Sequence, residues 1–341
     1  MPDREAAITA FLAHAGWGDS AIAPLAGDAS NRRYLRLKRT DPVQLAVLMD
    51  APPVRGEDVH PFIQISNWLT NAGFSAPKIF ASDEEQGFLL LEDLGDDLFA
   101  RVIPARPEQE STLYTCATDV LVSLHECAAP ATLAPYSISV MTDLAALAYD
   151  WYLGASQGAD TLAKAQFGAE MTAVLAQHAP QQDVLIQRDY HSENLLWLPE
   201  RDGVARVGLL DFQDAMLGHR AYDLVSLLQD ARRDVPPTIE AEMIQHYITA
   251  ANQDQDRFTA AYHVLGAQRN LRILGVFARL CVRDGKAHYV DLIPRVWGLL
   301  QRDLAHPALA DLARIITDTL PTPTATLLQG LKDKCPTIPA Q

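Results

Sequence analysis

The hydrophobic pattern changes abruptly near residue 93, and this change restricts the chain to few architectures. Before that point, short apolar runs alternate with turn residues, which predicts strands at 22–26, 34–38, 44–49, 79–81 and 88–91. Apolar residues at helical spacing predict helices at 4–15 and near 62–73. Beyond residue 93 the pattern is mostly helical, apart from short strand-like pieces between 184 and 210. A small antiparallel sheet followed by a larger helical part is an α+β arrangement.

The length of the chain predicts that the strand-rich part and the helical part form two lobes. A chain of 341 residues is longer than one hydrophobic core usually organises. With 48% apolar residues, it can bury a sizeable core in each lobe. We therefore expect an N-terminal lobe at 1–93 and a C-terminal lobe at 94–341.

Charge and cysteine content argue against several classes of protein. A formal net charge of −15 repels a phosphate backbone, so nucleic acid is not an expected partner. The N-terminus lacks the pattern of a secretory signal, and the longest uncharged stretch, 59–77, is too polar to span a membrane. Four cysteines lie far apart without a CxxC pair, which fits a reducing compartment. We expect a cytoplasmic monomer with no membrane partner.

The strongest chemical signal is the stretch 187–194, which reads Gln-Arg-Asp-Tyr-His-Ser-Glu-Asn. Asp189 and Asn194 lie five positions apart, between two short predicted strands. Phosphoryl transfer needs a carboxylate that orients the attacking hydroxyl and accepts its proton, and an oxygen ligand for a metal ion beside the phosphates. A tight loop between strands holds both groups on one support.

A second carboxylate, Asp211, follows an apolar strand 22 residues after Asp189 and precedes Phe212. Mg²⁺ prefers carboxylate and amide oxygens together with phosphates, and Asp211 with Asn194 supplies such oxygens. Each piece alone more often marks a cap or an Asx-turn. Together they have the order R-D-x4-N followed by D-F, which is typical of a kinase catalytic lobe.

With these motifs the chain resembles the aminoglycoside phosphotransferase superfamily, which has a two-lobed protein-kinase-like fold. The resemblance implies that Asp189 is the catalytic base, that Asn194 and Asp211 bind magnesium, and that ATP is the phosphate donor. Further stretches are similar to one branch, the N-acetylmuramate/N-acetylglucosamine anomeric kinases. They are 90–95 (Leu-Leu-Glu-Asp-Leu-Gly), 211–228 and 271–289. This branch implies phosphorylation of the sugar at O1, in the recycling of peptidoglycan.

The first lobe is expected to bind the nucleotide. The turn between the first two predicted strands consists of Gly27, Asp28, Ala29, Ser30, Asn31 and Arg32. Small residues let backbone N–H groups approach phosphates, although a plain hairpin turn would look similar. Glu92, Asp93 and Leu94 are expected as the hinge that meets the adenine edge. Many kinases carry a phosphate-binding Lys on the third strand.

In this chain Met49 stands at that third-strand position, so Arg32 or Arg33 is expected to meet the phosphate charge. Because the lysine is missing, Glu57 is not expected to be its helix partner. Gln213 likewise replaces the glycine that usually follows Asp-Phe.

The acceptor is expected to meet several converging polar groups. The candidates are His191, Gln213, Asp214, Arg269, Arg272 and Arg279. An Arg is suited to the lactyl carboxylate of muramate, yet these arginines could equally brace helices. Asp223 is expected to cap a helix or to brace the catalytic loop.

Two other functions remain open from the sequence. The acidic composition suits a cationic acceptor, such as an aminoglycoside or an amino alcohol like choline; homoserine is a further small acceptor. The missing third-strand Lys also fits a non-catalytic nucleotide-binding protein, but such a protein has no need of Asp189, Asn194 and Asp211 together.

Overall fold

The computed structural model describes residues 4–25 and 31–336. It divides into two compact units, Met1–Val120 with Ser192–Ala215, and Leu121–His191 with Met216–Gln341. The catalytic stretch predicted from the sequence thus contributes residues to both units. The division into lobes at residue 93 stays a prediction.

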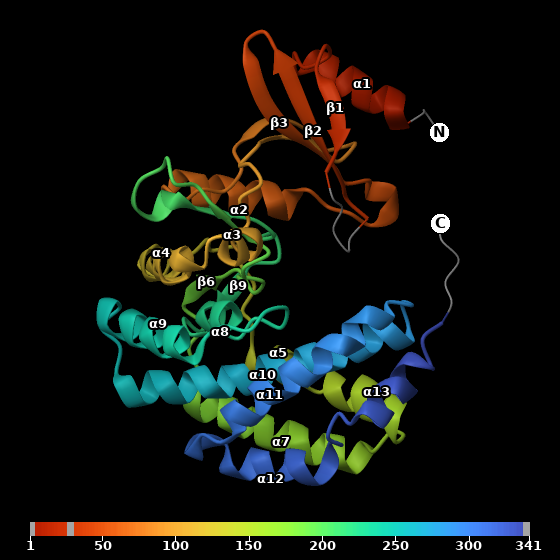
Figure 1. The fold of residues 1–341 in the computed structure, drawn as a ribbon, viewed down its shortest axis with the longest axis vertical. Coiled ribbons are helices and arrows are strands. Elements are labelled where there is room, and N and C mark those ends of the chain that lie inside the picture. Colours follow the sequence, from red (N-terminus) through yellow and green to blue (C-terminus); the bar gives the residue numbers. More distant parts are fainter. Residues whose placement is uncertain (1–3, 26–30, 337–341) are drawn as a thin grey trace. The chain divides into compact units, whose positions relative to one another are not determined.

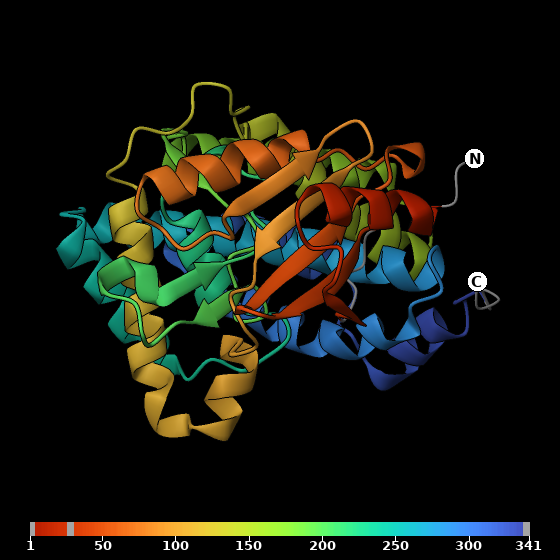
Figure 2. The same cartoon turned by 90° about the horizontal axis from the view of Figure 1, so that it is seen from above.

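The first unit contains a five-stranded antiparallel sheet (Figure 1). Its strands are β1 (Ala21–Pro24), β2 (Arg33–Thr40), β3 (Val43–Asp50), β4 (Ile79–Asp83) and β5 (Phe88–Glu92), in the order β1-β2-β3-β5-β4. Helix α1 (Arg4–His14) packs its apolar side on one face of the sheet, where Leu37, Ala46 and Leu48 are buried (Figure 2). Because side chains alternate along a strand, Tyr34, Arg36 and Val47 lie on the opposite face.

A short hairpin in the first unit carries two of the predicted site residues on its ends. Strands β7 (Leu195–Trp197) and β8 (Val207–Leu209) pair antiparallel. The hairpin is tied to the rest of the unit by backbone hydrogen bonds from Leu209 to Ser75 (2.8 Å) and from Trp197 to Asp97 (2.8 Å). The helices of this part are α2 (His60–Asn71), α3 (Phe99–Ala105) and α4 (Glu110–Leu124), whose last residues belong to the second unit. Asn194 therefore directly precedes a strand and Asp211 closely follows one.

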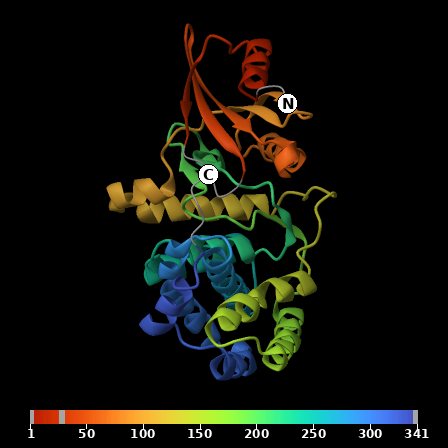
Figure 3. The ribbon, with the colours of Figure 1, turned by 90° about the vertical axis from the view of Figure 1, so that its right-hand side faces the viewer.

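The second unit is a group of helices with one small two-stranded sheet (Figure 3). Strands β6 (Val184–Ile186) and β9 (Met216–Gly218) form that sheet. The helices are α5 (Ile138–Ala145), α6 (Gly154–Ser156), α7 (Thr161–His178), α8 (Tyr222–Leu228), α9 (Pro237–Ala250), α10 (Gln255–Val282), α11 (Ile293–Leu304), α12 (Ala310–Thr319) and α13 (Ala325–Lys332). Helix α10 starts at the side-chain cap of Asp254 and runs through the unit, with most of its residues buried.

The predicted fold class is confirmed, since a small antiparallel sheet and a larger helical portion are both present. The three strand-like pieces predicted between 184 and 210 are β6, β7 and β8. In the described part of the chain, no helix combines the length and apolar character needed to cross a membrane.

Candidate active site

The segment that presents Asp189 is anchored by a buried carboxylate from α8. Asp223 is fully buried, and its oxygens accept the backbone N–H groups of Gln187 (2.6 Å) and Arg188 (2.9 Å). Arg188 has a φ of 72°, an unusual conformation for a side-chain-bearing residue. Burial raises the pKa of Asp223 to about 7, although the two N–H bonds act in the opposite direction. Of the two roles predicted for Asp223, the structure shows the bracing one.

The electrostatic surroundings of Asp189 favour its ionised form. Burial by itself would raise the pKa of the carboxyl, but the positive charges of Arg272 and Arg269 outweigh it. The pKa of Asp189 therefore lies below its ordinary value. A general base must be deprotonated before it can accept a proton, so this environment suits the predicted role.

Two of the predicted acceptor arginines are held by neighbouring groups of the second unit. The buried Arg269 donates to the hydroxyl of Ser226 (2.8 Å) and to the carbonyl of Gln229 (3.4 Å). Arg272 donates to the hydroxyl of Tyr222 (3.2 Å). These contacts fit the bracing interpretation, and a contact with the acceptor stays a prediction.

The other acceptor candidates are spread over both units. His191 is buried beside Arg232, with 3.4 Å between Nε2 and Nη1, and burial lowers its pKa to about 4. Arg279 lies on α10, where partial burial lowers its pKa. Gln213 and Asp214 belong to the first unit. Their acceptor roles also stay predictions.

Asn194 and Asp211 face each other in the first unit. The amide Nδ2 of Asn194 lies 3.4 Å from Oδ2 of Asp211, and the N–H of Leu210 donates to the carbonyl of Asn194 (3.0 Å). Gln213 donates from Nε2 to Oδ1 of Asp211 (2.6 Å). Asp211 has a φ of 58°, so its backbone turns sharply after β8.

This oxygen set fits a magnesium ion that binds together with phosphates. Among the described residues, no group of three or more His, Cys, Asp or Glu side chains gathers as a metal site. Mg²⁺ is typically held by one or two carboxylates, with water and substrate phosphates completing its octahedron. One carboxylate from Asp211 and the amide oxygen of Asn194, after a flip of that amide, supply such a partial set.

A cavity of about 430 Å³ in the first unit contains both of these residues. Its walls are mostly apolar and include Leu25, Val47, Leu91, Leu94, Leu196 and Leu210. Glu92, Asp93 and Leu94, the predicted hinge, form part of its edge. The volume falls in the range of small-molecule sites. A planar adenine ring would be shielded from water between these apolar walls, next to the oxygens that would hold a metal ion.

The third-strand position predicted to lack a cation does lack one. Met49 is fully buried and lies on the same face of the sheet as Val47, which lines the cavity. Gly27, Asp28, Ala29 and Ser30, part of the predicted phosphate turn, lie outside the described residues.

The remaining turn residues, Asn31 and Arg32, are both bound to Glu57. The N–H of Asn31 donates to Oε1 of Glu57 (3.1 Å), and Arg32 forms an ion pair with Oε2 (2.8 Å). Glu57 is therefore the partner of these two turn residues.

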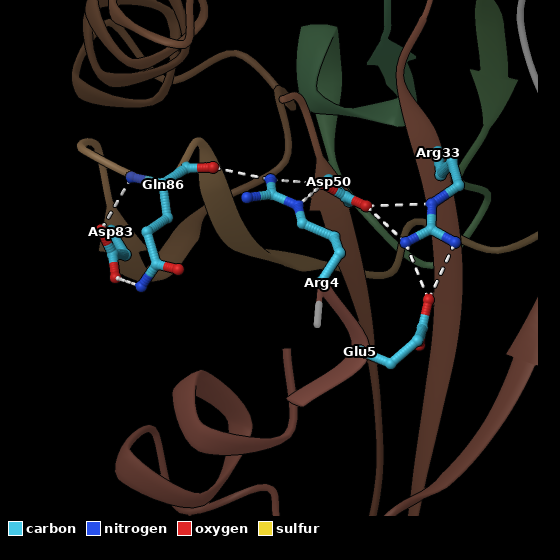
Figure 4. Close-up of polar contacts among 6 residues, drawn as sticks. All are labelled: Arg4, Glu5, Arg33, Asp50, Asp83 and Gln86. Carbon is cyan, nitrogen blue, oxygen red and sulfur yellow. Dashed lines mark hydrogen bonds and ion pairs between the residues drawn. The ribbon is translucent and has the colours of Figure 1, made fainter. Parts of the chain in front are cut away.

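The prediction that Arg33 could meet the phosphates is wrong. Arg33 pairs with Asp50 (2.7 Å) and with Glu5 of α1 (3.0 Å), and Arg4 binds the other oxygen of Asp50 (Figure 4). Asp50 is fully buried on the face that packs against α1. The alternation of side chains along β2 therefore turns Arg33 away from the cavity and turns its neighbour Tyr34 toward it.

The sequence reasoning missed Arg36, which lines the cavity. It forms ion pairs with Asp93 (2.6 Å) and Asp96 (2.7 Å), on the turn that follows β5. The signal available in the sequence was its position on the predicted strand 34–38, two residues from Tyr34 and thus on the same face. Its partners lie about sixty residues away, which no local pattern indicates.

Comparisons with known proteins show the family of the chain. The model of the phosphotransferase enzyme family matches residues 21–261. An N-acetylmuramate/N-acetylglucosamine kinase of Caulobacter vibrioides is 41% identical, over 91% of this chain and 95% of the relative. A kinase of the same name from Pseudomonas aeruginosa is 34% identical, over 88% of this chain and 90% of the relative.

Solved structures of low sequence identity have the same fold. A choline/ethanolamine kinase family protein from Mesorhizobium loti matches with a TM-score of 0.62 at 16% identity, over 92% of this chain and all of its own (100%). An aminoglycoside-3'-phosphotransferase of type VIII matches with a TM-score of 0.53 at 19% identity, over 77% of this chain and 97% of its own. The chain therefore belongs to the phosphotransferase enzyme family, as a kinase of the group that includes the N-acetylmuramate/N-acetylglucosamine kinases.

Proposed function

We propose that this kinase transfers the γ-phosphate of ATP to the anomeric O1 hydroxyl of N-acetylmuramate and N-acetylglucosamine. The named activity of the relatives in Caulobacter vibrioides and Pseudomonas aeruginosa, which match nearly the whole chain, supports the acceptor. The product would be an amino-sugar 1-phosphate, as expected in the recycling of peptidoglycan. We further propose a cytoplasmic monomer, with nucleotide binding in a lobe at 1–93 and catalysis in a lobe at 94–341.

Asp189 is proposed as the base. The charges of Arg272 and Arg269 keep the pKa of its carboxyl low, so it is ionised at neutral pH. It would orient the O1 hydroxyl and accept its proton while the bond from O1 to the γ-phosphorus forms and the bond to the β–γ bridging oxygen breaks. An anomeric hydroxyl is more acidic than an ordinary alcohol, so positioning and charge neutralisation would dominate the rate.

Asn194 and Asp211 are proposed as the protein ligands of magnesium, beside the nucleotide cavity. When bound, Mg²⁺ supplies positive charge next to the β- and γ-phosphates. Gln213, which donates to Asp211 at 2.6 Å, would fix the orientation of that carboxylate. Gly27, Asp28, Ala29, Ser30, Asn31 and Arg32 are proposed to cover the phosphates, and Glu92, Asp93 and Leu94 to meet the adenine edge.

The observation that carries the proposal is that Asp211 and Asn194 face one apolar cavity, while Asp189, five residues before Asn194, is kept ionised. The test measures ATP consumption with N-acetylmuramate, N-acetylglucosamine, choline, homoserine and kanamycin, and locates the product phosphate by phosphorus NMR. We expect turnover with the two amino sugars and a phosphate at C1. Turnover with choline or kanamycin alone would favour the cationic acceptor and refute the proposal. ATP binding without turnover on any acceptor would favour the non-catalytic alternative.

A base variant adds a second test of the mechanism. Asp189→Asn keeps the shape of the side chain but cannot accept a proton, so kcat should fall by about a thousandfold or more. Thermal unfolding of the variant should stay close to that of the wild type. A variant with full kcat would remove Asp189 from the role of base.

A further inference from the structure

Arg36 fixes one edge of the cavity through contacts with two carboxylates. Its guanidinium fork meets Asp93 at both oxygens, with 2.6 Å from Nε and 2.9 Å from Nη2, and meets Asp96 with Nη1 at 2.7 Å. The side chain of Asp93 is 2% exposed, and its Oδ1 also accepts the N–H of Gly95 (2.9 Å). One arginine on β2 therefore holds the turn at 93–96, which includes two residues of the predicted hinge, Asp93 and Leu94.

The charge of Arg36 matters because the cavity lining is acidic. Among the described residues, its carboxylates are those of Glu92, Asp93, Asp96, Glu193 and Asp211, and its guanidinium groups are those of Arg36 and Arg101. The third strand contributes the neutral Met49 where many kinases have a lysine. A triphosphate entering this cavity would be repelled by any carboxylate that lacks a compensating cation.

Replacing Arg36 by a neutral residue would leave carboxylates of the cavity without their compensating cation. The hydrogen bond from Arg36 is the largest cause that lowers the pKa of Asp96, so this carboxylate is ionised at neutral pH. Asp93 would keep the N–H of Gly95 as a partner but would lose both contacts with the guanidinium fork. The edge of the cavity would then present both carboxylates without the guanidinium that offsets one of their two negative charges.

We propose that Arg36 is a positioning residue that sets the nucleotide affinity of this cavity. It does so by offsetting one of the two negative charges of Asp93 and Asp96 and by holding their turn against β2. The inference rests on the proposed function, because it takes the ligand of the cavity to be a nucleoside triphosphate. Arg36 would supply positive charge to the cavity, as a third-strand lysine does in many kinases. This role does not require contact between Arg36 and the phosphates.

A neighbouring arginine on β2 provides a matched control. Arg33 pairs with Asp50 (2.7 Å) and with Glu5 (3.0 Å), and Asp50 has Arg4 as a further partner (2.6 Å). The residues described as lining the cavity include neither Arg33 nor its two partners. Loss of Arg33 thus removes a cation from the same strand, while every carboxylate of the cavity lining keeps its own partners.

The experiment measures the binding of Mg-ATP by titration calorimetry and the steady-state kinetics for both substrates. For Arg36→Met we expect Kd and KM for ATP to rise about tenfold or more, with kcat and the acceptor KM within twofold of wild type. Arg36→Lys keeps the charge but loses the fork, so its Kd should be intermediate. The triple variant Arg36→Met, Asp93→Asn, Asp96→Asn should recover most of the lost affinity, since it removes the carboxylates as well. Arg33→Met should change Kd by less than twofold.

Three outcomes would overturn the inference: wild-type affinity in Arg36→Met, no recovery in the triple variant, or an equal loss in Arg33→Met. If Arg36→Met does not fold, the lysine and triple variants still provide the comparison. A wild-type protein that binds Mg-ATP but phosphorylates neither amino sugar would refute the proposed acceptor and leave this inference intact. A wild-type protein that binds no nucleotide would overturn both.

Discussion

The buried carboxylate of Asp223 should give the folded protein a pH dependence that one substitution removes. Burial raises its pKa from the ordinary value of 3.8 to about 7. Between these two values the folded state keeps a proton on Asp223 that the unfolded chain has released. Stability from this group is therefore complete below pH 3.8 and is lost as the pH rises toward 7.

The size of the effect follows from the shift in pKa. A shift of about three units corresponds to about 4 kcal/mol of unfolding free energy, at about 1.4 kcal/mol per unit. Asp223→Asn cannot titrate, so the unfolding free energy of wild type should fall by about 3 kcal/mol more than that of the variant between pH 4 and pH 7, and the remainder is lost outside this range. Urea denaturation of both proteins across this range measures the difference, and titrating groups far from Asp223 cancel in the comparison.

The same variant should also slow the reaction. An asparagine offers one oxygen where two N–H groups, from Gln187 and Arg188, need acceptors at 2.6 and 2.9 Å. The segment before Asp189 would shift, and a misplaced base costs on the order of a hundredfold in kcat. Parallel pH profiles of stability in both proteins would refute the reasoning, because they would mean that the two N–H bonds offset the effect of burial and that Asp223 titrates normally.

Further predictions concern the metal ligands and the helix packing. Asp211→Ala should raise the magnesium concentration needed for half-maximal activity by about tenfold or more. Asn194→Ala should raise it by less, because a carboxylate binds Mg²⁺ more strongly than an amide. An unchanged magnesium titration would refute both roles. Gly275→Ala should lower the unfolding free energy by about 2–4 kcal/mol, because a methyl group there would lie 2.2 Å from the backbone carbon of Leu147. Gly298→Ala is the matched control on α11, where nothing lies within 4 Å, and helix propensity should raise the unfolding free energy by about 1 kcal/mol. Thermal or urea unfolding compares the two glycine variants, and equal shifts would contradict the packing argument.

The sequence by itself determined the elements that depend on local pattern. Short apolar runs between turn residues predicted all five strands of the sheet, and the strands before Asp189, after Asn194 and before Asp211 were predicted as short pieces near their observed positions. Strand β9, which follows Asp211, was not predicted. This is possible because turn residues and side-chain alternation act over a few neighbouring residues. The catalytic motif, R-D-x4-N followed by D-F, could also be recognised from the sequence, because its residues lie within one short stretch of the chain.

Only the tertiary structure decided which distant residues support those elements. The sequence left open whether Asp223 caps a helix or braces the loop; its bonds to Gln187 and Arg188 span about 36 residues of chain. It suggested Arg33 as a phosphate ligand, yet the pairing of β2 with β3 and the packing of α1 direct Arg33 to Asp50. Contacts such as these depend on how distant elements pack, for example on which face of the sheet α1 covers. A local sequence pattern contains no information on that packing.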